Sequence, residues 1–256
     1  RSRGRLVEVD SLEELDDRLA AGVGSLRGWR VLGVDLRDRH DALASVSVAG
    51  ATFLACRLAP ADEERLRAHG ALVLALPEEA PVSPRTALYR AEELYGTERY
   101  ADSFDARAYA WSQLPFDPDR ALARVLHDHT IDLALDEWMT GRRLVGVMGG
   151  HRLERDDPGY AAAARLGAAL GAGAVVATGG GPGAMEAANL GARLGSSTDH
   201  LEEALALLAG VPSYRPSVDA WVALAFDVLD RSPGGRETLG IPTWHYGHEP
   251  PNAFAT

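Results

Sequence analysis

The chain has 256 residues, of which 46% are hydrophobic and 25% are charged. This composition is typical of a folded globular protein and excludes a disordered, collagen-like or coiled-coil chain. The formal net charge of −11 argues against a nucleic-acid partner, because basic clusters normally provide the affinity for duplexes. The single cysteine, Cys56, excludes both an intrachain disulfide and a zinc site built from cysteines.

All 26 basic residues are arginine, and the chain contains no lysine. A Schiff base, a lysine-bound pyridoxal phosphate and a P-loop lysine are therefore excluded, and we expect no cofactor. Any bound anion must be held by arginine, by backbone N–H groups or by helix ends. No segment near Arg1 resembles a signal peptide and no apolar run reaches about 18 residues, so we expect a cytoplasmic protein without a membrane partner.

Short apolar runs alternate with helical patterns over the first eighty residues. A capping box at Ser11–Glu14 predicts a helix that continues to about Ala20. The elements predicted after it are strands at residues 30–36, 51–56 and 71–76 and a helix at 61–69. We therefore expect residues 1–80 to form a small α/β accessory domain with a parallel sheet, and no internal repeat is evident in the sequence.

The acidic, proline-containing segment 77–84 is typical of a linker. A helical connector is predicted over residues 81–125, with a broken helical pattern at 86–112 followed by a long helix over 117–140. Residues 126–256 are predicted to form the larger α/β domain. Its strands are expected at 144–148 and 174–178, and its helices at 158–170, 184–194, 200–208 and 218–230.

Two glycine-rich turns follow the two predicted strands of this larger domain. The first contains Gly149 and Gly150, and the second runs from Gly179 to Gly183, directly before a predicted helix. Glycine lets the backbone approach a ligand closely, and a helix N-terminus offers free N–H groups with partial positive charge. Both turns would lie at the carboxyl edge of a parallel sheet, so they predict a phosphate site that needs no lysine.

The second turn also fits the dinucleotide fingerprint, as Gly179-x-Gly181-x-x-Ala184. The confirming acidic residue, about twenty positions later, would be Asp199, but no predicted strand presents it. A mononucleotide or phosphate site is therefore favoured over an NAD(P) site. The simpler alternative is that these glycines serve only tight turns and close helix–strand packing.

A longer pattern resembles the Lonely Guy (LOG) family. It consists of Val147-Met-Gly-Gly-His151, Tyr160, Gly167 and Thr178-Gly-Gly-Gly-Pro-Gly-Ala-Met-Glu-Ala-Ala-Asn189. Within that family the pattern is most similar to the long bacterial nucleoside 5′-monophosphate nucleosidases, and Ile241–Ala255 adds to the similarity. The resemblance covers roughly residues 143–256 and implies a Rossmann-like α/β fold, with a parallel sheet and helices on both faces. It also implies a homodimer or a higher homo-oligomer.

The resemblance further implies hydrolysis of the N-glycosidic bond of a nucleoside 5′-monophosphate, which yields the free base and ribose 5-phosphate. Carried over residue by residue, it assigns substrate and phosphate contacts to Gly149, Gly150, Gly180, Gly181, Gly183, Ala184 and Met185. In the same way, Glu249 and Asn252 match an acidic segment that would contact the sugar hydroxyls.

One motif of the family is absent from the chain. Pro-Gly-x-x-Gly-Thr-x-x-Glu supplies the family's phosphate loop and catalytic glutamate, and Ser232–Thr238 only imitates it. Glu237 stands at the position of a glycine, and the segment follows a predicted helix instead of a strand. The catalytic residues are therefore unknown. We expect the natural protein to continue beyond Thr256, and the other interpretation is a relative that binds nucleotides without hydrolysing them.

Three hypotheses about function follow from these patterns. The first is a nucleotide N-glycosidase, in which the glycine turns anchor the 5′-phosphate of the substrate. The second is a non-catalytic nucleotide-binding protein with a regulatory role. The third is an NAD(P)-dependent enzyme, which depends on the fingerprint at Gly179 alone.

Histidines and carboxylates form two patterns that resemble metal sites. His129, Asp132 and Asp136 have a spacing that puts them on one helix face, and a solvated surface explains them equally well. The prolines before His245 and His248 disfavour the helix that a two-histidine zinc site needs. We therefore expect no metal.

Three other features have structural explanations that we favour. Cys56 is expected to be a buried small hydrophobe, and Arg215 a surface residue. The aromatic cluster between the two domains is expected to lie in a helical core or interface, with base stacking as the alternative. It comprises Tyr89, Tyr95, Tyr100, Tyr109 and Trp111.

Overall fold

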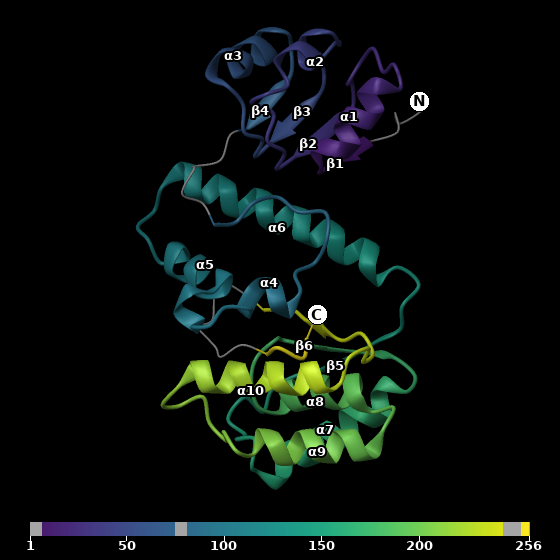
Figure 1. Cartoon of the computed structure of the whole chain (residues 1–256), viewed down its shortest axis with the longest axis vertical. Helices are drawn as coiled ribbons and strands as arrows, with labels where there is room; N and C mark the ends of the chain where they lie inside the picture. The colour runs from purple at the N-terminus through teal and green to yellow at the C-terminus, as the bar shows by residue number, and fades with distance from the viewer. Residues whose placement is uncertain (1–6, 75–80, 243–251, 256) are drawn as a thin grey trace. The chain divides into compact units, whose positions relative to one another are not determined.

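The computed structural model describes residues 7–74, 81–242 and 252–255 of the chain. It confirms an α/β fold in which parallel strands form two sheets flanked by helices, consistent with a Rossmann-like arrangement (Figure 1). The chain divides into two compact units. The N-terminal unit comprises residues 1–88 and 115–136, and the C-terminal unit comprises residues 89–114 and 137–256.

In the N-terminal unit, a four-stranded parallel sheet has the order β1-β2-β3-β4, so each strand pairs with the next one in the sequence. The strands are β1 (Val7–Val9), β2 (Trp29–Leu32), β3 (Thr52–Leu54) and β4 (Leu72–Leu74), and the helices between them are α1 (Leu12–Ala20), α2 (His40–Ala44) and α3 (Pro60–Ala68). The predicted start of α1 is confirmed, because the Ser11 hydroxyl accepts a hydrogen bond of 3.2 Å from the Glu14 amide, whereas the Glu14 carboxylate accepts from Arg18 and not from the Ser11 amide.

The regular spacing of these strands shows that the expectation of no internal repeat is wrong. Register-matched residues in the four strands are Glu8, Arg30, Thr52 and Leu72, which lie 22, 22 and 20 residues apart. This period, with every strand beside its sequence neighbour, is typical of a solenoid. The sequence conceals it because the repeats share little more than a glycine followed four positions later by leucine, at Gly28, Gly50 and Gly70.

A left-handed backbone position recurs before each of the last three strands. Gly28, Gly50 and Gly70 have φ angles of +79°, +76° and +83°. The Gly28 amide donates to the Gly50 carbonyl oxygen at 3.0 Å, and the Gly50 amide donates to the Gly70 carbonyl oxygen at 2.9 Å. Successive repeats therefore turn at the same place because a glycine adopts the same conformation there.

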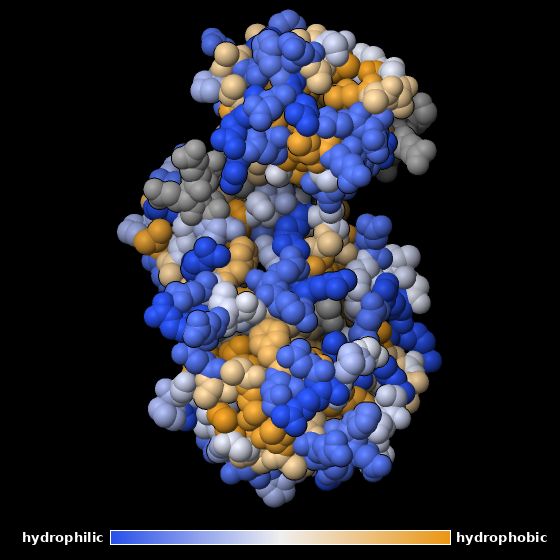
Figure 2. Space-filling view, in the orientation of Figure 1, coloured by the Kyte–Doolittle hydropathy of each residue, from blue (hydrophilic) through white to orange (hydrophobic). Residues whose placement is uncertain are grey.

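Large apolar side chains fill the space between this sheet and its helices. Leu15, Leu43 and Leu66 contribute one buried leucine from each helix, and Val31 and Phe53 come from the central strands. On the face shown in Figure 2, hydrophilic residues cover most of the surface of this unit. The N-terminal unit thus has a hydrophobic core of its own, as an independent repeat structure requires.

The C-terminal unit contains a three-stranded parallel sheet in the order β5-β6-β7. Its strands are β5 (Leu144–Val147), β6 (Val175–Thr178) and β7 (Leu239–Gly240), and its helices are α4 (Ala91–Tyr95), η1 (Tyr100–Asp102, a 3₁₀ helix), α5 (Phe104–Ser112), α7 (Pro158–Gly171), α8 (Ala184–Leu194), α9 (Thr198–Leu208) and α10 (Val218–Arg231). Helix α6 (Pro118–Met139) begins in one unit and ends in the other. The predicted elements between residues 144 and 230 are confirmed to within two residues at their ends, whereas the sequence pattern does not predict β7.

Helices α7 and α8 pack very closely because glycines on each helix face the backbone of the other. A Cβ atom on Gly167 would lie 2.2 Å from the Ala188 carbonyl oxygen, and one on Gly191 would lie 1.7 Å from the Ala164 carbonyl oxygen. A small apolar core, built around Val176 of β6, lies between the helices and the sheet. This packing fixes α8 against the strands that precede the glycine-rich turns.

A second and larger core joins α9 and α10 to the early helices of this unit. Trp221 of α10 and Leu208 of α9 pack in it together with Tyr95, Tyr100 and Phe254. Residues 81–125, expected as a connector, are shared between the units: 81–88 and 115–125 belong to the N-terminal unit and 89–114 to the C-terminal one. The apolar side chains of α4 and η1 account for this division, because they are buried in the C-terminal core.

Candidate functional site

The two glycine-rich turns lie at the same edge of the C-terminal sheet, because they follow the paired parallel strands β5 and β6. Gly149 and Gly150 have φ angles of +89° and +69°, and Gly180 and Gly183 each have a φ angle of +72°. Residues with side chains rarely adopt this left-handed conformation. The backbone path of both turns therefore requires glycine at these four positions.

The turns also contact each other. The Gly150 carbonyl oxygen accepts a hydrogen bond of 3.0 Å from the amide of Ala184, the first residue of α8. A Cβ atom on Gly150 would lie 2.5 Å from Ala184 Cβ, and one on Gly183 would lie 2.3 Å from the Gly150 oxygen. Close packing thus provides a reason for these two glycines that does not involve a ligand.

Four backbone amides around the start of α8 have no acceptor among the described residues. They belong to Gly181, Gly183, Met185 and Glu186, which are buried. The N-cap residue is Gly183, which has no side chain that could cap these amides. Buried backbone donors are almost always paired, and these lie at the positive end of a helix dipole. This arrangement suits an anion such as phosphate.

A buried ion pair involves the first turn of α8. The Arg155 guanidinium donates to both Glu186 carboxylate oxygens, with Nη2···Oε1 at 2.5 Å and Nε···Oε2 at 3.2 Å, and neither side chain is exposed. The Tyr160 hydroxyl donates to Glu186 Oε2 at 2.9 Å. Burial, together with the Glu186 carboxylate, raises the pKa of Tyr160 well above its usual value, so the hydroxyl stays a donor.

Asn189 on α8 connects the sheet with the C-terminal segment. Its Oδ1 accepts hydrogen bonds from the Thr178 hydroxyl at 2.7 Å and from Asn252 Nδ2 at 2.9 Å. Its Nδ2 donates to the carbonyl oxygens of Val176 and Leu239 at 3.3 and 3.4 Å. The Thr178 hydroxyl in turn accepts from the Gly180 amide at 3.0 Å. The buried side chains of Thr178 and Asn189 therefore connect the second turn to the core.

The structure brings seven of the predicted site residues together at this edge: Gly149, Gly150, Gly180, Gly181, Gly183, Ala184 and Met185. Their contact with a nucleotide stays a prediction. Asn252 is 2% exposed, and its Oδ1 accepts from the Phe254 amide at 3.2 Å. Its expected contact with sugar hydroxyls also stays a prediction, and Glu249 lies outside the described residues.

Sequence reasoning missed the polar side chains that support this edge. Tyr160, Glu186 and Asn189 all stand within the pattern that resembles the LOG family, so the sequence contained a signal for them. Arg155 had no such signal, because it lies 31 residues from Glu186 in a loop with other charged residues. Only the tertiary packing shows that Arg155 is the buried partner.

Of the two patterns that resemble metal sites, the structure describes only the first. Within the ranges that the structure describes, no group of three His, Cys, Asp or Glu side chains could hold a metal ion, which includes His129, Asp132 and Asp136. His245 and His248 lie outside those ranges. The segment Ser232–Thr238, which imitates the missing motif, follows α10 and precedes β7. It is therefore not a loop at the carboxyl end of a strand.

The structural explanations for Cys56 and for two of the tyrosines are confirmed. Burial raises the pKa of the Cys56 thiol to about 11, and its Sγ donates to the Val31 carbonyl oxygen at 3.3 Å. The thiol is therefore protonated near neutral pH and is not a nucleophile. Tyr95 and Tyr100 are buried in the helical core, and Arg215 is exposed, as expected.

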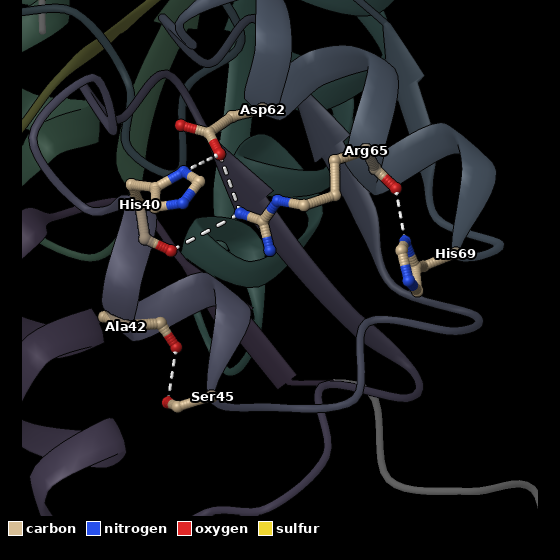
Figure 3. A network of polar contacts seen from close by, with 6 residues as sticks. All are labelled: His40, Ala42, Ser45, Asp62, Arg65 and His69. Atoms are coloured by element: carbon tan, nitrogen blue, oxygen red, sulfur yellow. Dashed lines mark hydrogen bonds and ion pairs between the residues drawn. The ribbon is translucent and has the colours of Figure 1, made fainter.

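A second polar cluster lies in the N-terminal unit (Figure 3). Asp62 is 2% exposed, and its Oδ1 contacts His40 Nδ1 at 2.6 Å and accepts from Arg65 Nη2 at 2.7 Å. Burial alone would raise the pKa of Asp62, but the hydrogen bonds and charges of Arg65 and His40 together hold it below its usual value. The cluster joins α2 to α3.

No protein-family model matches this chain, and no curated protein matches it either. The resemblance to the LOG family therefore rests on the quoted motif residues. Among the helices of the described residues, none is long and apolar enough to cross a membrane.

Proposed function

We propose that the protein binds a nucleoside 5′-monophosphate at the carboxyl edge of β5 and β6 and hydrolyses its N-glycosidic bond. The four amides that have no acceptor within the described part of the chain, at Gly181, Gly183, Met185 and Glu186, carry this proposal. They would donate to the oxygens of the 5′-phosphate. A chain without lysine has to bind such an anion through its backbone or through arginine, and this helix N-terminus offers the backbone donors.

The proposed reaction places the phosphate away from the bond that breaks. Water attacks the anomeric carbon, the bond to the base nitrogen breaks with its electron pair on the base, and the base gains the proton that the water loses. Positive charge develops on the sugar in the transition state, and a nearby carboxylate would stabilise it. The phosphate contacts would contribute binding energy that orients the sugar. Glu249 and Asn252 are the residues proposed to lie toward the sugar, and the catalytic residues are not assigned.

A second candidate function is binding of the same ligand without hydrolysis. It is favoured by the state of Glu186, the carboxylate in the first turn of α8, because both of its oxygens are occupied by Arg155 and Tyr160. A carboxylate held in this way is not free to act on a substrate. A protein that senses a phosphorylated ligand needs the amides but no catalytic carboxylate. An NAD(P)-dependent enzyme has no comparable support.

The test combines a binding measurement with a reaction measurement. Calorimetric titration with ribose 5-phosphate should give saturable binding, and incubation with AMP, GMP, CMP, UMP and IMP should release free base, detected by chromatography. Binding with base release supports hydrolysis, and binding alone supports the second candidate. If neither ribose 5-phosphate nor any of the monophosphates binds, both proposals are wrong.

A charge-reversal variant locates the binding site. Gly181→Asp should abolish binding of ribose 5-phosphate, because it adds a carboxylate at the proposed phosphate site. Gly173→Asp is the matched control, since Gly173 is an exposed glycine in the turn before β6, where a Cβ atom would meet nothing within 4 Å. Equal affinity in the two variants, with the fold intact by circular dichroism, would exclude this turn as the phosphate site.

A further inference from the structure

Glu186 stands at a position where an acidic side chain normally caps its own helix. It is the third residue of α8, after Ala184 and Met185, with Gly183 as the N-cap. At this position a glutamate usually reaches back to the N-cap amide, as in a capping box. Here no such bond is present, and the Gly183 amide has no acceptor among the described residues.

The carboxylate of Glu186 is instead turned toward the interior. Oε1 accepts from Arg155 Nη2 at 2.5 Å, and Oε2 accepts from both Arg155 Nε at 3.2 Å and the Tyr160 hydroxyl at 2.9 Å. Neither charged side chain is exposed. Burying an ion pair is costly, so its presence beside a helix N-terminus calls for an explanation beyond stability.

Arg155 is itself fixed by contacts with other elements. Its Nη1 donates to the Trp221 carbonyl oxygen at 3.1 Å, and its Cζ lies 3.3 Å from the centroid of the Trp221 ring. Its backbone amide donates to the Pro212 carbonyl oxygen at 2.9 Å. Independently of Glu186, the guanidinium is therefore held by Trp221 of α10, and the Arg155 backbone is held by the loop before that helix.

We propose that Arg155 is a positioning residue that holds and neutralises Glu186, so that the N-terminal amides of α8 stay available to a phosphate. This inference rests on the proposed phosphate site. Without Arg155, the Glu186 carboxylate would lose its cationic partner within one helical turn of that site, where an acidic group opposes a bound anion and the helix dipole. The freed carboxylate would also accept a hydrogen bond from the Gly183 amide and remove that donor.

Two substitutions separate this electrostatic role from a merely structural one. Arg155→Met removes the cation that holds Glu186, so binding of ribose 5-phosphate should weaken at least tenfold. Arg155→Met combined with Glu186→Met removes both charges, and replacing a buried ion pair by apolar side chains is often tolerated. The double variant should bind ribose 5-phosphate within about threefold of the wild type. Calorimetry gives the affinities, and thermal unfolding gives the stability of each variant.

A purely structural role predicts a different pattern. In that case the double variant would bind as weakly as Arg155→Met, because both lack the contacts of Arg155 with Trp221, and the proposal would be overturned. Arg155→Lys keeps the positive charge and replaces Arg155→Met in the binding test if that variant fails to fold. It should bind ribose 5-phosphate within about threefold of the wild type, and a tenfold loss in this variant would also contradict the proposal.

A measurement without ligand keeps this inference separate from the proposed function. Amide exchange by NMR should be at least fivefold slower at Gly183 in Arg155→Met than in the wild type, because Glu186 then caps that amide, and the double variant should lose the protection. If the wild type binds no ribose 5-phosphate, the proposed function fails and this exchange measurement alone decides about Arg155. Unchanged exchange at Gly183 would show that Arg155 does not hold Glu186 away from the helix N-terminus.

Discussion

Glycine has one role in the N-terminal unit and a second one in the C-terminal unit. In the solenoid, Gly28 has a φ angle of +79°, and a Cβ atom there would meet nothing within 4 Å. Glycine is needed at Gly28 only for the backbone conformation. On the helices of the C-terminal unit, Gly167 and Gly191 have no positive φ angle but lie against the backbone of the neighbouring helix.

Because of this difference, substitution of a glycine by a larger residue should lower the free energy of unfolding by different amounts in the two units. Forcing a side chain into the left-handed conformation costs about 1–2 kcal/mol, because the clash is local. Adding an atom where two backbones touch forces whole elements apart and costs more. The ion pairs of the two units differ in exposure. The side chain of His40, which contacts Asp62, is 60% exposed, whereas Arg155 and Glu186 are both fully buried.

The largest expected effect is at Gly191. Alanine in place of a mid-helix glycine normally stabilises a helix by about 1 kcal/mol. Gly191→Ala should instead destabilise the C-terminal unit by about 2–4 kcal/mol, because the new Cβ would lie 1.7 Å from the Ala164 carbonyl oxygen. Hydrogen exchange with peptide-level resolution measures this loss in α7 and α8, with residues 7–74 unchanged.

Gly173→Ala provides the matched control for this substitution. Gly173 has no positive φ angle, and a Cβ atom there would meet nothing within 4 Å. It should change stability by less than about 0.5 kcal/mol. A stable Gly191→Ala variant would mean that α7 and α8 can move apart without cost, which contradicts the role assigned to close packing.

An intermediate effect is expected at Asp62 in the N-terminal unit. Asp62→Asn removes the ion pair with Arg65 and should destabilise this unit by about 1–2 kcal/mol at pH 7. Because the folded-state pKa of Asp62 is lowered, its contribution is present above the unfolded pKa of about 3.9 and is lost as the pH falls through the lower folded value. Urea unfolding at pH 7 and at pH 2.5 measures the difference between the variant and the wild type.

The control for Asp62 is an exposed carboxylate with a similar partner. Asp35 pairs with Arg37 at 2.5 Å on the surface, and the Arg37 hydrogen bond lowers the pKa of Asp35 to about 2. Exposed pairs of this kind contribute little, so Asp35→Asn should leave the unfolding midpoint unchanged at pH 7. If Asp62→Asn destabilises the unit equally at both pH values, the effect does not come from the carboxylate charge.

Local patterns predicted the individual elements well, and for physical reasons. The helix 184–194 was predicted with the bounds that the structure gives to α8, because a glycine precedes it and apolar residues recur at helical spacing within it. The N-cap bond of Ser11 likewise depends only on residues three positions apart. Strand β7 escaped prediction because it has only two residues and is followed by Ile241-Pro242, which gives no strand pattern.

What the sequence did not reveal depends on contacts between distant residues. The solenoid is defined by backbone pairing between repeats whose side chains differ, so local patterns do not reveal its period of about 22 residues. At the candidate site, the two turns could be predicted from the sequence, because clustered glycines after a predicted strand indicate a turn. The pair of Arg155 and Glu186 could not, because nothing local distinguishes a buried arginine from a surface one.

The smallest expected effect compares two equivalent positions of the solenoid. Gly33 and Ala55 follow β2 and β3, with φ angles of +66° and +55°, and their amides donate to the next strand at Leu54 and Leu74. Gly33→Ala should destabilise the unit by about 1 kcal/mol, because a Cβ atom there makes only an ordinary contact and the cost is conformational.

Ala55→Gly is the reverse substitution in the next repeat. It relieves the left-handed alanine but gives the unfolded chain more freedom, so the net gain in stability should be below about 1 kcal/mol. Urea unfolding of both variants measures the two signs, and the dependence on urea concentration should stay unchanged. Because the two positions are equivalent by the repeat, opposite signs are expected. Destabilisation by both substitutions would mean that Ala55 is selected for a packing contact, and the repeat would then not determine the residue at this position.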